Sequence, residues 1–382
     1  MNMRITFIIP NLFTGGVEIQ AITQANELMK QGTSIQFIVL SDVDTMKKDL
    51  AKEIIFYRNN VKSLRSINYQ SVFGFIYSFN KISKQINNFS PDHIIAILPP
   101  AIGMVRLLKY FHKINAKIWP YHHSTEYLNA PLNSIRRRLY HFLFVSRISG
   151  KNEHHLFISK AVESDIKNNE KIRRGDILYN AINGPSLNME RQRLLFNKYG
   201  ISDKSYIIIP GRLHPVKGHL FFLNSVKTLI NKYNLTILIA GFGSMEKNIL
   251  EFIALNKLSQ NVIVTGHLKN EEILELISGA LFCVVPSKIE GLGNVAIESL
   301  AVGTTVLSSN AGGLIEIIQN NQNGYIFEKE NSSDLYKKFQ MLICKELKLI
   351  PPQKLKDDFL LRFTTDQQIG TLLELMESDE DF

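Results

Sequence analysis

"SYIIIPGRLHPVKGHLFFLNSVKTLI" spans residues 205–230 and contains, in order, an apolar run, a turn bounded by glycines and an amphipathic segment. The apolar run predicts a strand buried on both faces, as strands in parallel α/β sheets are. The residues after the turn have the apolar spacing of a helix. A strand, a short turn and a helix in succession are the repeating unit of a parallel α/β sheet.

The same alternation runs along the whole chain. In the first half, predicted strands are separated by segments with helical spacing and lie at 3–10, 34–41, 93–99, 117–123 and 155–160. In the second half, the predicted strands lie at 205–213, 235–243, 262–266, 281–287, 304–313 and 324–328. This pattern predicts an α/β fold of two doubly wound, Rossmann-like domains in tandem. Ligands are then expected at the carboxyl ends of the strands, in the cleft between the domains.

The domain boundary is expected near residues 183–186, where Asn, Gly, Pro and Ser cluster. We therefore predict an N-terminal Rossmann-like domain over 1–184 and a second Rossmann-like domain over 185–364. Residues 365–382 are predicted to form a C-terminal helix and an acidic tail. A length of 382 residues fits two such domains.

Composition favours a protein of the cytoplasm. The chain is 45% hydrophobic and 21% charged, which is typical of a soluble globular protein. No run approaches the roughly 18 apolar residues of a membrane span. The two cysteines, Cys283 and Cys344, both lie in apolar runs, which is typical of buried thiols in a reducing compartment.

Positive charge is concentrated in the first half of the chain. Residues 1–190 hold 24 Lys and Arg against 14 Asp and Glu, in a chain whose net charge is +9. One interpretation is docking on an anionic membrane surface, and the other is a basic, solvated face without a partner. No helix-turn-helix, zinc-finger or RNA-binding signature accompanies the charge, so we expect no nucleic-acid partner.

The turn at residues 211–218 places Arg212 and Lys217 between a strand and a helix. Backbone N–H groups and the positive end of the helix favour an anion at such a turn. Arginine adds a fork that matches phosphate oxygens, and lysine adds a point charge. The sequence thus indicates a phosphate site, with a solvated basic loop as the alternative.

Two glutamates follow a later strand, in "SKIEGLGNVAIESLAVG" at residues 287–303. Glu290 is predicted in the loop, and Glu298 about two turns into the next helix. The neighbours of Glu298 are apolar or small, which indicates a carboxylate close to packed surface. A carboxylate in such a place needs hydrogen-bond donors, and the hydroxyls of a sugar or ribose supply them.

Two further glycine motifs carry weaker signals. Gly15 and Gly16 follow the first predicted strand, where a ligand could approach the backbone closely, although an ordinary tight turn explains them equally. "AGFGS" at residues 240–244 offers a similar approach at Gly241. Glu246 stands where a dinucleotide fingerprint needs its third glycine, so such a fingerprint is not supported.

In this order the motifs resemble retaining glycosyltransferases of the GT-B fold, and glycosyltransferase family 4 in particular, of the bacterial surface-polysaccharide type. The family pattern is a glycine pair after the first strand, then G-R-L-x-x-x-K-G, E-G-x-x-x-x-x-x-E, G-T-P-V and G-G-x-x-E. Here it is matched by Gly15–Gly16, "GRLHPVKG", "EGLGNVAIE", "GTTV" and "AGGLIE". The resemblance covers most of the chain and is strongest over residues 206–327.

The resemblance implies roles for the charged residues. Arg212 and Lys217 should hold the diphosphate of the donor and neutralise charge on the departing nucleotide. Glu290 should contact the hydroxyls of the donor sugar, and Glu298 those of the ribose. Gly16 should pack against the diphosphate across the cleft.

The resemblance also implies contacts from the backbone. The N–H groups of Gly291, Leu292 and Asn294 should lie near the phosphate, and Gly241 should allow a close approach of the donor. The family uses no metal ion and no cofactor besides the nucleotide sugar. In agreement, "DVD" at 42–44 has the letters of a magnesium motif but is better explained as a solvated loop.

"WPYHHSTEY" at residues 119–127 resembles the family segment that ends in a histidine near the reacting sugar. His123 aligns best, and His122 is the alternative because the doubled histidine leaves the register open. The role implied is a hydrogen bond to the sugar or support of the transition state. A structural histidine is the alternative explanation. Departures from the family pattern at Ala181, Leu292 and Thr305 leave every charged site position unchanged.

The resemblance implies transfer of a sugar, with UDP expected as the donor nucleotide, to a glycan or polyprenyl-diphosphate acceptor for bacterial surface polysaccharide. The acceptor is expected on the basic N-terminal domain, at the inner face of the membrane. A non-catalytic partner subunit with the same fold is the main alternative. A nicotinamide-dependent oxidoreductase lacks its glycine fingerprint here, and a same-fold epimerase or phosphorylase is a minor enzymatic alternative.

Overall fold

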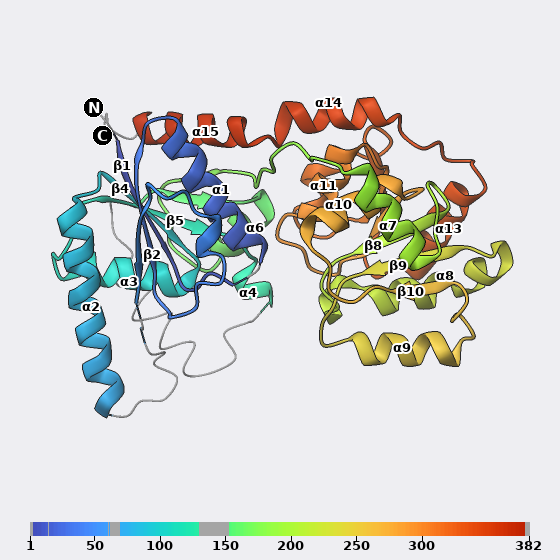
Figure 1. Cartoon of the computed structure of the whole chain (residues 1–382), viewed down its shortest axis with the longest axis horizontal. Helices are drawn as coiled ribbons and strands as arrows, with labels where there is room; N and C mark the ends of the chain where they lie inside the picture. The colour runs from blue at the N-terminus through green and yellow to red at the C-terminus, as the bar shows by residue number, and fades with distance from the viewer. Residues whose placement is uncertain (1–2, 14, 60, 62–68, 130–152, 379–382) are drawn as a thin grey trace. The chain divides into compact units, whose positions relative to one another are not determined.

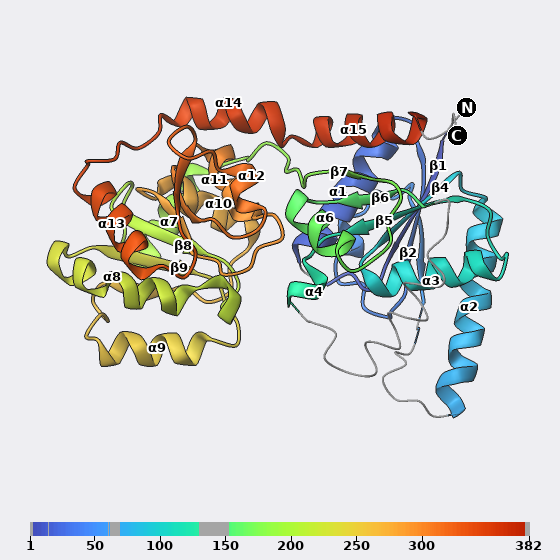
Figure 2. The same ribbon diagram turned by 180° about the vertical axis from the view of Figure 1, so that it is seen from behind.

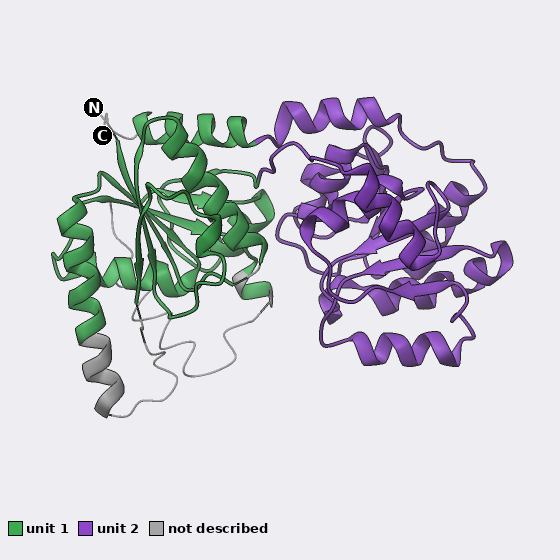
Figure 3. Ribbon diagram, in the orientation of Figure 1, with its two compact units in different colours: residues 1–180, 365–382 green, residues 181–364 purple. Residues whose placement is uncertain are grey.

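The computed structural model describes residues 3–13, 15–59, 61, 69–129 and 153–378 (Figure 1). The chain divides into two compact units (Figure 3). The first contains residues 1–180 and 365–382, and the second contains residues 181–364.

The first unit is built on a seven-stranded sheet in the order β3-β2-β1-β4-β5-β6-β7, and every strand pair in it is parallel. The strands are β1 (Arg4–Ile9), β2 (Ser34–Val39), β3 (Ile55–Arg58), β4 (His93–Ile97), β5 (Lys117–His122), β6 (His155–Phe157) and β7 (Gly175–Ile177). The sequence pattern explains the layers, because β1, β2 and β4 are almost wholly buried runs that need cover on both faces.

Helices cover the first sheet, and the last helix of the chain joins this unit. The helices are α1 (Gly16–Lys30), α2 (Tyr69–Phe89), α3 (Pro99–Tyr110), α4 (Glu126–Asn129), α6 (Lys160–Lys167) and α15 (Thr365–Ser378), with a 3-10 turn at Lys47–Asp49. The helix α15 packs against α1, and the two lie together in both views (Figures 1 and 2). The amide of Gln368 on α15 donates to the carbonyl of Tyr179, which fixes the C-terminal helix to this unit.

The second unit is built on a six-stranded parallel sheet in the order β10-β9-β8-β11-β12-β13. The strands are β8 (Tyr206–Pro210), β9 (Thr236–Ala240), β10 (Val262–Val264), β11 (Cys283–Val285), β12 (Val306–Ser309) and β13 (Gly324–Phe327). The helices are α7 (Met189–Tyr199), α8 (His219–Tyr233), α9 (Glu246–Leu255), α10 (Asn270–Gly279), α11 (Asn294–Val302), α12 (Leu314–Ile317), α13 (Ser332–Ile343) and α14 (Pro352–Arg362), with a 3-10 turn at Pro215–Lys217.

Both sheets share one topology. Numbered within its own unit, each sheet runs 3-2-1-4-5-6, and the first adds a seventh strand. This is the doubly wound, Rossmann-like order, so the predicted fold class is confirmed. In such a sheet the strand order reverses between the first and fourth strands, which are β1 and β4 in one unit and β8 and β11 in the other. No described helix is long and apolar enough to span a membrane.

Gly218 fixes the turn between β8 and α8. Its φ is +74°, and a Cβ atom added there would lie 1.9 Å from the carbonyl oxygen of Pro286. A side chain at this position would therefore force apart the turn after β8 and the loop after β11. Glycine is required here both by backbone conformation and by space.

Replacing Gly218 by alanine is expected to lower the free energy of unfolding by about 2–4 kcal/mol, because strain and overlap add. Gly184→Ala is the matched control, since a Cβ atom at Gly184 would meet nothing within 4 Å. Urea unfolding of both variants measures the difference. Equal stabilities of the two variants would show that the turn is not constrained in this way.

Candidate active site in the second unit

The loops after β8 and β11 lie side by side at the switch point of the second sheet. Cys283 of β11 pairs with Ile208 of β8, so the two strands are direct neighbours and their carboxyl ends meet at one edge. Helices leave these two strands toward opposite faces, which opens a crevice in doubly wound sheets. The residues after β8 include Arg212 and Lys217, and those after β11 include Glu290. The topology therefore brings together three of the residues that the sequence singles out.

The loop after β8 is shaped by its own side chains and presents Arg212 to solvent. His214 caps the 3-10 turn, because its Nδ1 accepts a hydrogen bond from the N–H of Val216 at 3.5 Å. Arg212 is exposed, and its guanidinium makes no hydrogen bond or ion pair with any described residue. An exposed guanidinium at a strand-to-helix turn is available to a phosphate group.

Lys217 and Glu290 form an ion pair across the two loops. The Nζ of Lys217 lies 2.7 Å from Oε2 of Glu290, and the hydroxyl of Ser287 donates to the same oxygen at 2.9 Å. The backbone joins the loops as well, since the N–H of Lys288 donates to the carbonyl of Val216 at 2.7 Å. The carboxylate is thereby held in one position beside the positive charge, while its other oxygen, Oε1, is not used in these contacts.

Two glycines after β12 support the backbone of Glu290. A Cβ atom on Gly312 would lie 1.8 Å from the Glu290 carbonyl oxygen, and one on Gly313 would lie 2.4 Å from that of Gly291. The N–H of Gly313 also points to the Glu290 carbonyl, at 3.4 Å. The "AGG" motif thus packs under the loop that carries the glutamate, a role that sequence reasoning did not assign to it.

The helix α11 begins beside Glu290 and presents its positive end to the same crevice. Its N-cap residue is Gly293, with φ +108°, which has no side chain to cap the first turn. The first N–H groups of a helix have no partner within the helix, and the helix dipole favours an anion at that end. At this end of the helix lie Gly291, Leu292 and Asn294. Their position is the basis for the proposal that their N–H groups contact a phosphate.

Glu298 lies on α11, half-buried among apolar side chains. No described residue forms an ion pair or hydrogen bond with its carboxyl group. Burial raises the pKa of Glu298 from 4.5 to about 7. Burial raises the pKa of the Cys283 thiol, and the nearby Glu298 charge raises it further, which places the Glu298 carboxyl near the start of β11. A carboxylate without a protein partner can accept hydrogen bonds from a ligand.

The pKa of Glu298 predicts a stability that depends on pH. The folded protein holds the carboxyl proton of Glu298 more tightly than the unfolded chain does. The contribution of this proton to the stability of the fold is therefore complete below about pH 4.5 and is lost as the pH rises to about 7. Glu298→Gln keeps the neutral form at every pH. The variant should therefore be more stable than the wild type at pH 8 and equally stable at pH 4, as measured by urea unfolding. A difference of the same size at both pH values would contradict the assigned pKa.

Gly241 has a packing role in the same unit. A Cβ atom there would lie 2.0 Å from the carbonyl oxygen of Gly211, so the loop after β9 can approach the loop after β8 only with glycine at this place. The N–H of Gly211 donates to the Ala240 carbonyl at 2.9 Å, and that of Leu213 to the Phe242 carbonyl at 2.9 Å. Its proposed contact with a donor remains a prediction.

In the first unit, the predicted residues also lie at carboxyl ends of strands. Gly16 begins α1 after β1, and His123 follows β5. His123 is 6% exposed, and neither of its ring nitrogens has a partner among the described residues. Burial, with a smaller effect of His122, lowers the pKa of His123 to about 3, so the ring is neutral. His122 is held differently, since its Nε2 lies 3.0 Å from Nδ1 of His155 inside the unit.

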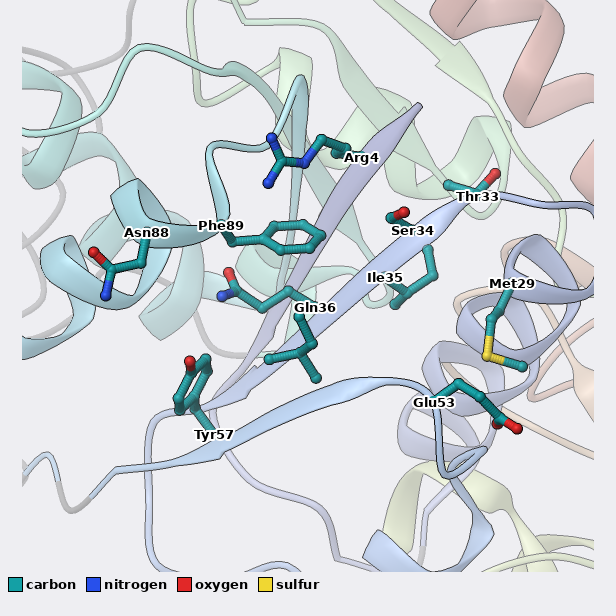
Figure 4. Close-up of a pocket in the computed structure, with 11 residues that line it drawn as sticks. Arg4, Met29, Thr33, Ser34, Ile35, Gln36, Glu53, Tyr57, Asn88 and Phe89 are labelled. Carbon is teal, nitrogen blue, oxygen red and sulfur yellow. The ribbon is translucent and has the colours of Figure 1, made fainter. Parts of the chain in front are cut away.

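A pocket at the opposite edge of the first sheet differs from the surroundings of His123, because the polar groups described below are engaged within the unit. It is formed near the amino ends of β1 and β2 and has a volume of about 430 Å³ (Figure 4). Its buried Gln36 accepts from Thr6 at 2.9 Å and donates to the Gln85 carbonyl at 3.0 Å. The Arg4 guanidinium stacks 4.9 Å from the centre of the Phe89 ring. These groups are satisfied within the unit, so the pocket is not the candidate site.

Among the described residues, no three His, Cys, Asp or Glu side chains are grouped to hold a metal ion.

Two doubly wound units with this strand order define the GT-B architecture. The family model described as "Glycosyl transferases group 1" matches residues 191–356, which lie in the second unit. An uncharacterised glycosyltransferase of Methanocaldococcus jannaschii is 30% identical over 214 residues, which are 56% of this chain and 55% of that protein. The chain thus spans about half the length of that relative.

Two other similarities are to a curated relative and to a solved structure. CapM of Staphylococcus aureus, a capsular polysaccharide biosynthesis glycosyltransferase, is 29% identical over 38% of this chain and 38% of its own. The solved structure of HepE from Anabaena in complex with UDP and glucose matches 98% of this chain and 100% of its own, with a TM-score of 0.80 and 15% identity. The second similarity shows the fold alone.

Proposed function

We propose that the chain is a retaining, metal-independent glycosyltransferase that uses a nucleotide diphosphate sugar. The observation that carries the proposal is the Lys217–Glu290 ion pair at 2.7 Å, beside the exposed Arg212 and the positive end of α11. Positive charge that is fixed before the reaction stabilises a diphosphate as it leaves, and a crevice that excludes water strengthens the effect. Arg212, Lys217 and the helix end together supply that charge without a metal ion.

The two glutamates have different roles in this proposal. Glu290 is fixed in the loop by Lys217 and Ser287, which suits a carboxylate that accepts hydrogen bonds from the donor sugar. Glu298 lies on α11, after the loop that carries Glu290, and has no partner among the described residues. Its carboxylate is therefore free to accept hydrogen bonds from the hydroxyls of the ribose. These carboxylates bind the donor, whereas the two carboxyls of a hydrolase flank the bond that breaks.

The sugar then keeps its configuration because the acceptor hydroxyl attacks on the face from which the diphosphate leaves. The departing phosphate oxygen takes the proton of that hydroxyl, so the C1–O bond to phosphate breaks as the C1–O bond to the acceptor forms. His123 is proposed to assist as a neutral hydrogen-bonding group, in agreement with its unpartnered ring nitrogens.

We propose UDP as the donor nucleotide and a glycan or polyprenyl-diphosphate as the acceptor. The UDP and glucose bound to HepE and the capsular polysaccharide named for CapM support this choice. The basic charge of residues 1–190 supports contact with an anionic membrane at its cytoplasmic face.

The test of this function is to incubate the protein with UDP-sugars in turn and measure the UDP released, with and without lipid-linked glycan acceptors. The anomeric configuration of the product is then read by NMR. We expect release from one UDP-sugar and an α-linked product from an α-linked donor. A product of inverted configuration would overturn the retaining assignment, and no release under any condition would overturn the enzymatic one.

A further inference from the structure

One peptide group in the loop after β11 is held from both sides. It joins Ser287 to Lys288, and its N–H donates to the carbonyl of Val216 at 2.7 Å. Its carbonyl oxygen accepts a hydrogen bond from the hydroxyl of Ser309 at 2.6 Å. Val216 lies in the 3-10 turn after β8, and Ser309 is the last residue of β12. Because a peptide group is planar, hydrogen bonds on its two opposite edges fix its orientation.

The orientation of this peptide group directs the side chain of Ser287. The Ser287 hydroxyl donates to Oε2 of Glu290 at 2.9 Å, and the ammonium of Lys217 donates to the same oxygen at 2.7 Å. Ser309 is therefore connected to the Glu290 carboxylate through a single residue, Ser287. The connection reaches from the third strand of this group, β12, to the loops after β11 and β8.

Both serine hydroxyls lie inside the unit, whereas the carboxylate reaches its surface. Ser309 is fully buried and Ser287 is 2% exposed, while the side chain of Glu290 is 12% exposed. Where a group is buried, water does not replace a hydrogen bond that a mutation removes. Without the Ser309 hydroxyl, the Ser287 carbonyl loses this partner, and the peptide group is free to turn.

The preceding residue, Ser308, provides a comparison on the same strand. It is also fully buried, but its hydroxyl has no partner among the described residues. Successive side chains of a strand point to opposite faces of the sheet. The two adjacent serines thus differ in their contacts, since Ser309 bonds the loop that carries Glu290 and Ser308 does not.

We propose that Ser309 is a positioning residue for sugar transfer, which acts through Ser287 to hold the Glu290 carboxylate toward the donor sugar. The inference rests on the function proposed above, because it requires Glu290 to contact the donor. A group that is already in place needs no reorganisation during the reaction, and this is the main source of electrostatic catalysis. Loss of Ser309 should therefore affect turnover, while the affinity for UDP is preserved because Arg212 lies in the other loop.

The test compares Ser309→Ala with Ser308→Ala, which removes the same atom from the same strand. Turnover is measured as UDP released from the UDP-sugar that the wild type uses, and the affinity for UDP by calorimetry. Ser309→Ala is expected to reduce turnover about tenfold, the usual effect of one lost buried hydrogen bond, with an affinity for UDP within about twofold of the wild type. Ser308→Ala should have the turnover of the wild type. Urea unfolding verifies that both variants are folded under the assay conditions.

A double variant separates positioning from a general loss of structure. In a Glu290→Ala background, Ser309→Ala should cause no further loss of turnover, because the carboxylate that it positions is absent. A tenfold loss in that background as well, or equal turnover of Ser309→Ala and Ser308→Ala, would overturn the proposal and leave Glu290 in the site. Wild-type turnover of Glu290→Ala alone would instead overturn the site assignment on which the inference rests.

Discussion

Glu290→Ala is expected to reduce sugar transfer by about 100-fold, while the affinity for UDP stays within about threefold of the wild type. The large effect is expected because the carboxylate is fixed by Lys217 and Ser287 and is proposed to contact the hydroxyls of the donor sugar. The small effect on UDP follows from the ion pair. Without Glu290, the ammonium of Lys217 is free to turn entirely to the diphosphate, which offsets any loosening of the loop. Turnover with the UDP-sugar and calorimetric titration with UDP measure the two quantities.

The matched control is Glu346→Ala, which removes an exposed glutamate from the same unit, outside the two loops. Its turnover and its affinity for UDP should both equal those of the wild type. If Glu290→Ala transfers sugar at the rate of this control, Glu290 does not contact the donor sugar and the proposed site is misassigned.

Arg212→Ala is expected to weaken mainly the binding of the nucleotide, whereas Glu290→Ala is expected to reduce mainly the turnover. The Arg212 guanidinium is exposed and makes no bond with the described part of the chain, so its removal should leave the fold unchanged. A charge-assisted bidentate contact with a diphosphate contributes about 2 kcal/mol, so the affinity for UDP should fall about 30-fold. Calorimetric titration of both proteins with UDP measures this loss.

Arg193→Ala is the control for this variant, because Arg193 is an exposed arginine on α7 of the same unit. It changes the net charge by the same amount without changing the turn after β8. A loss of affinity of equal size in both variants would mean that the effect comes from overall charge and not from a phosphate contact.

The sequence was sufficient to predict the two sheets because most of their strands are long apolar runs. The strands β3 and β7 were missed. β3 (Ile55–Arg58) is an edge strand in which no residue is fully buried, and β7 (Gly175–Ile177) has only three residues, none of them buried. Short, exposed edge strands carry neither an apolar run nor a clear alternation, so their pattern cannot be told from that of a loop.

For the candidate site, the sequence predicts which residues follow strands, but it does not predict which side chains meet. The sequence places Arg212, Lys217 and Glu290 after strands, but it does not give the neighbour of each strand. The ion pair between Lys217 and Glu290 depends on β8 and β11 being adjacent, and on the hydrogen bond from Lys288 to Val216. The buried state of His219 was also not predictable, because its place at the start of an amphipathic helix is equally compatible with solvent.

The measurement that tests the central claim most directly is calorimetric titration of the protein with UDP, GDP, CDP, dTDP and NAD. We propose that the site takes a nucleoside diphosphate, because Arg212 and Lys217 lie at the switch point and the loop after β9 lacks a dinucleotide fingerprint. We expect micromolar binding of one diphosphate, UDP, and none of NAD. Binding of NAD, or of none of the five nucleotides, would contradict the assignment of the second unit as the nucleotide-sugar site.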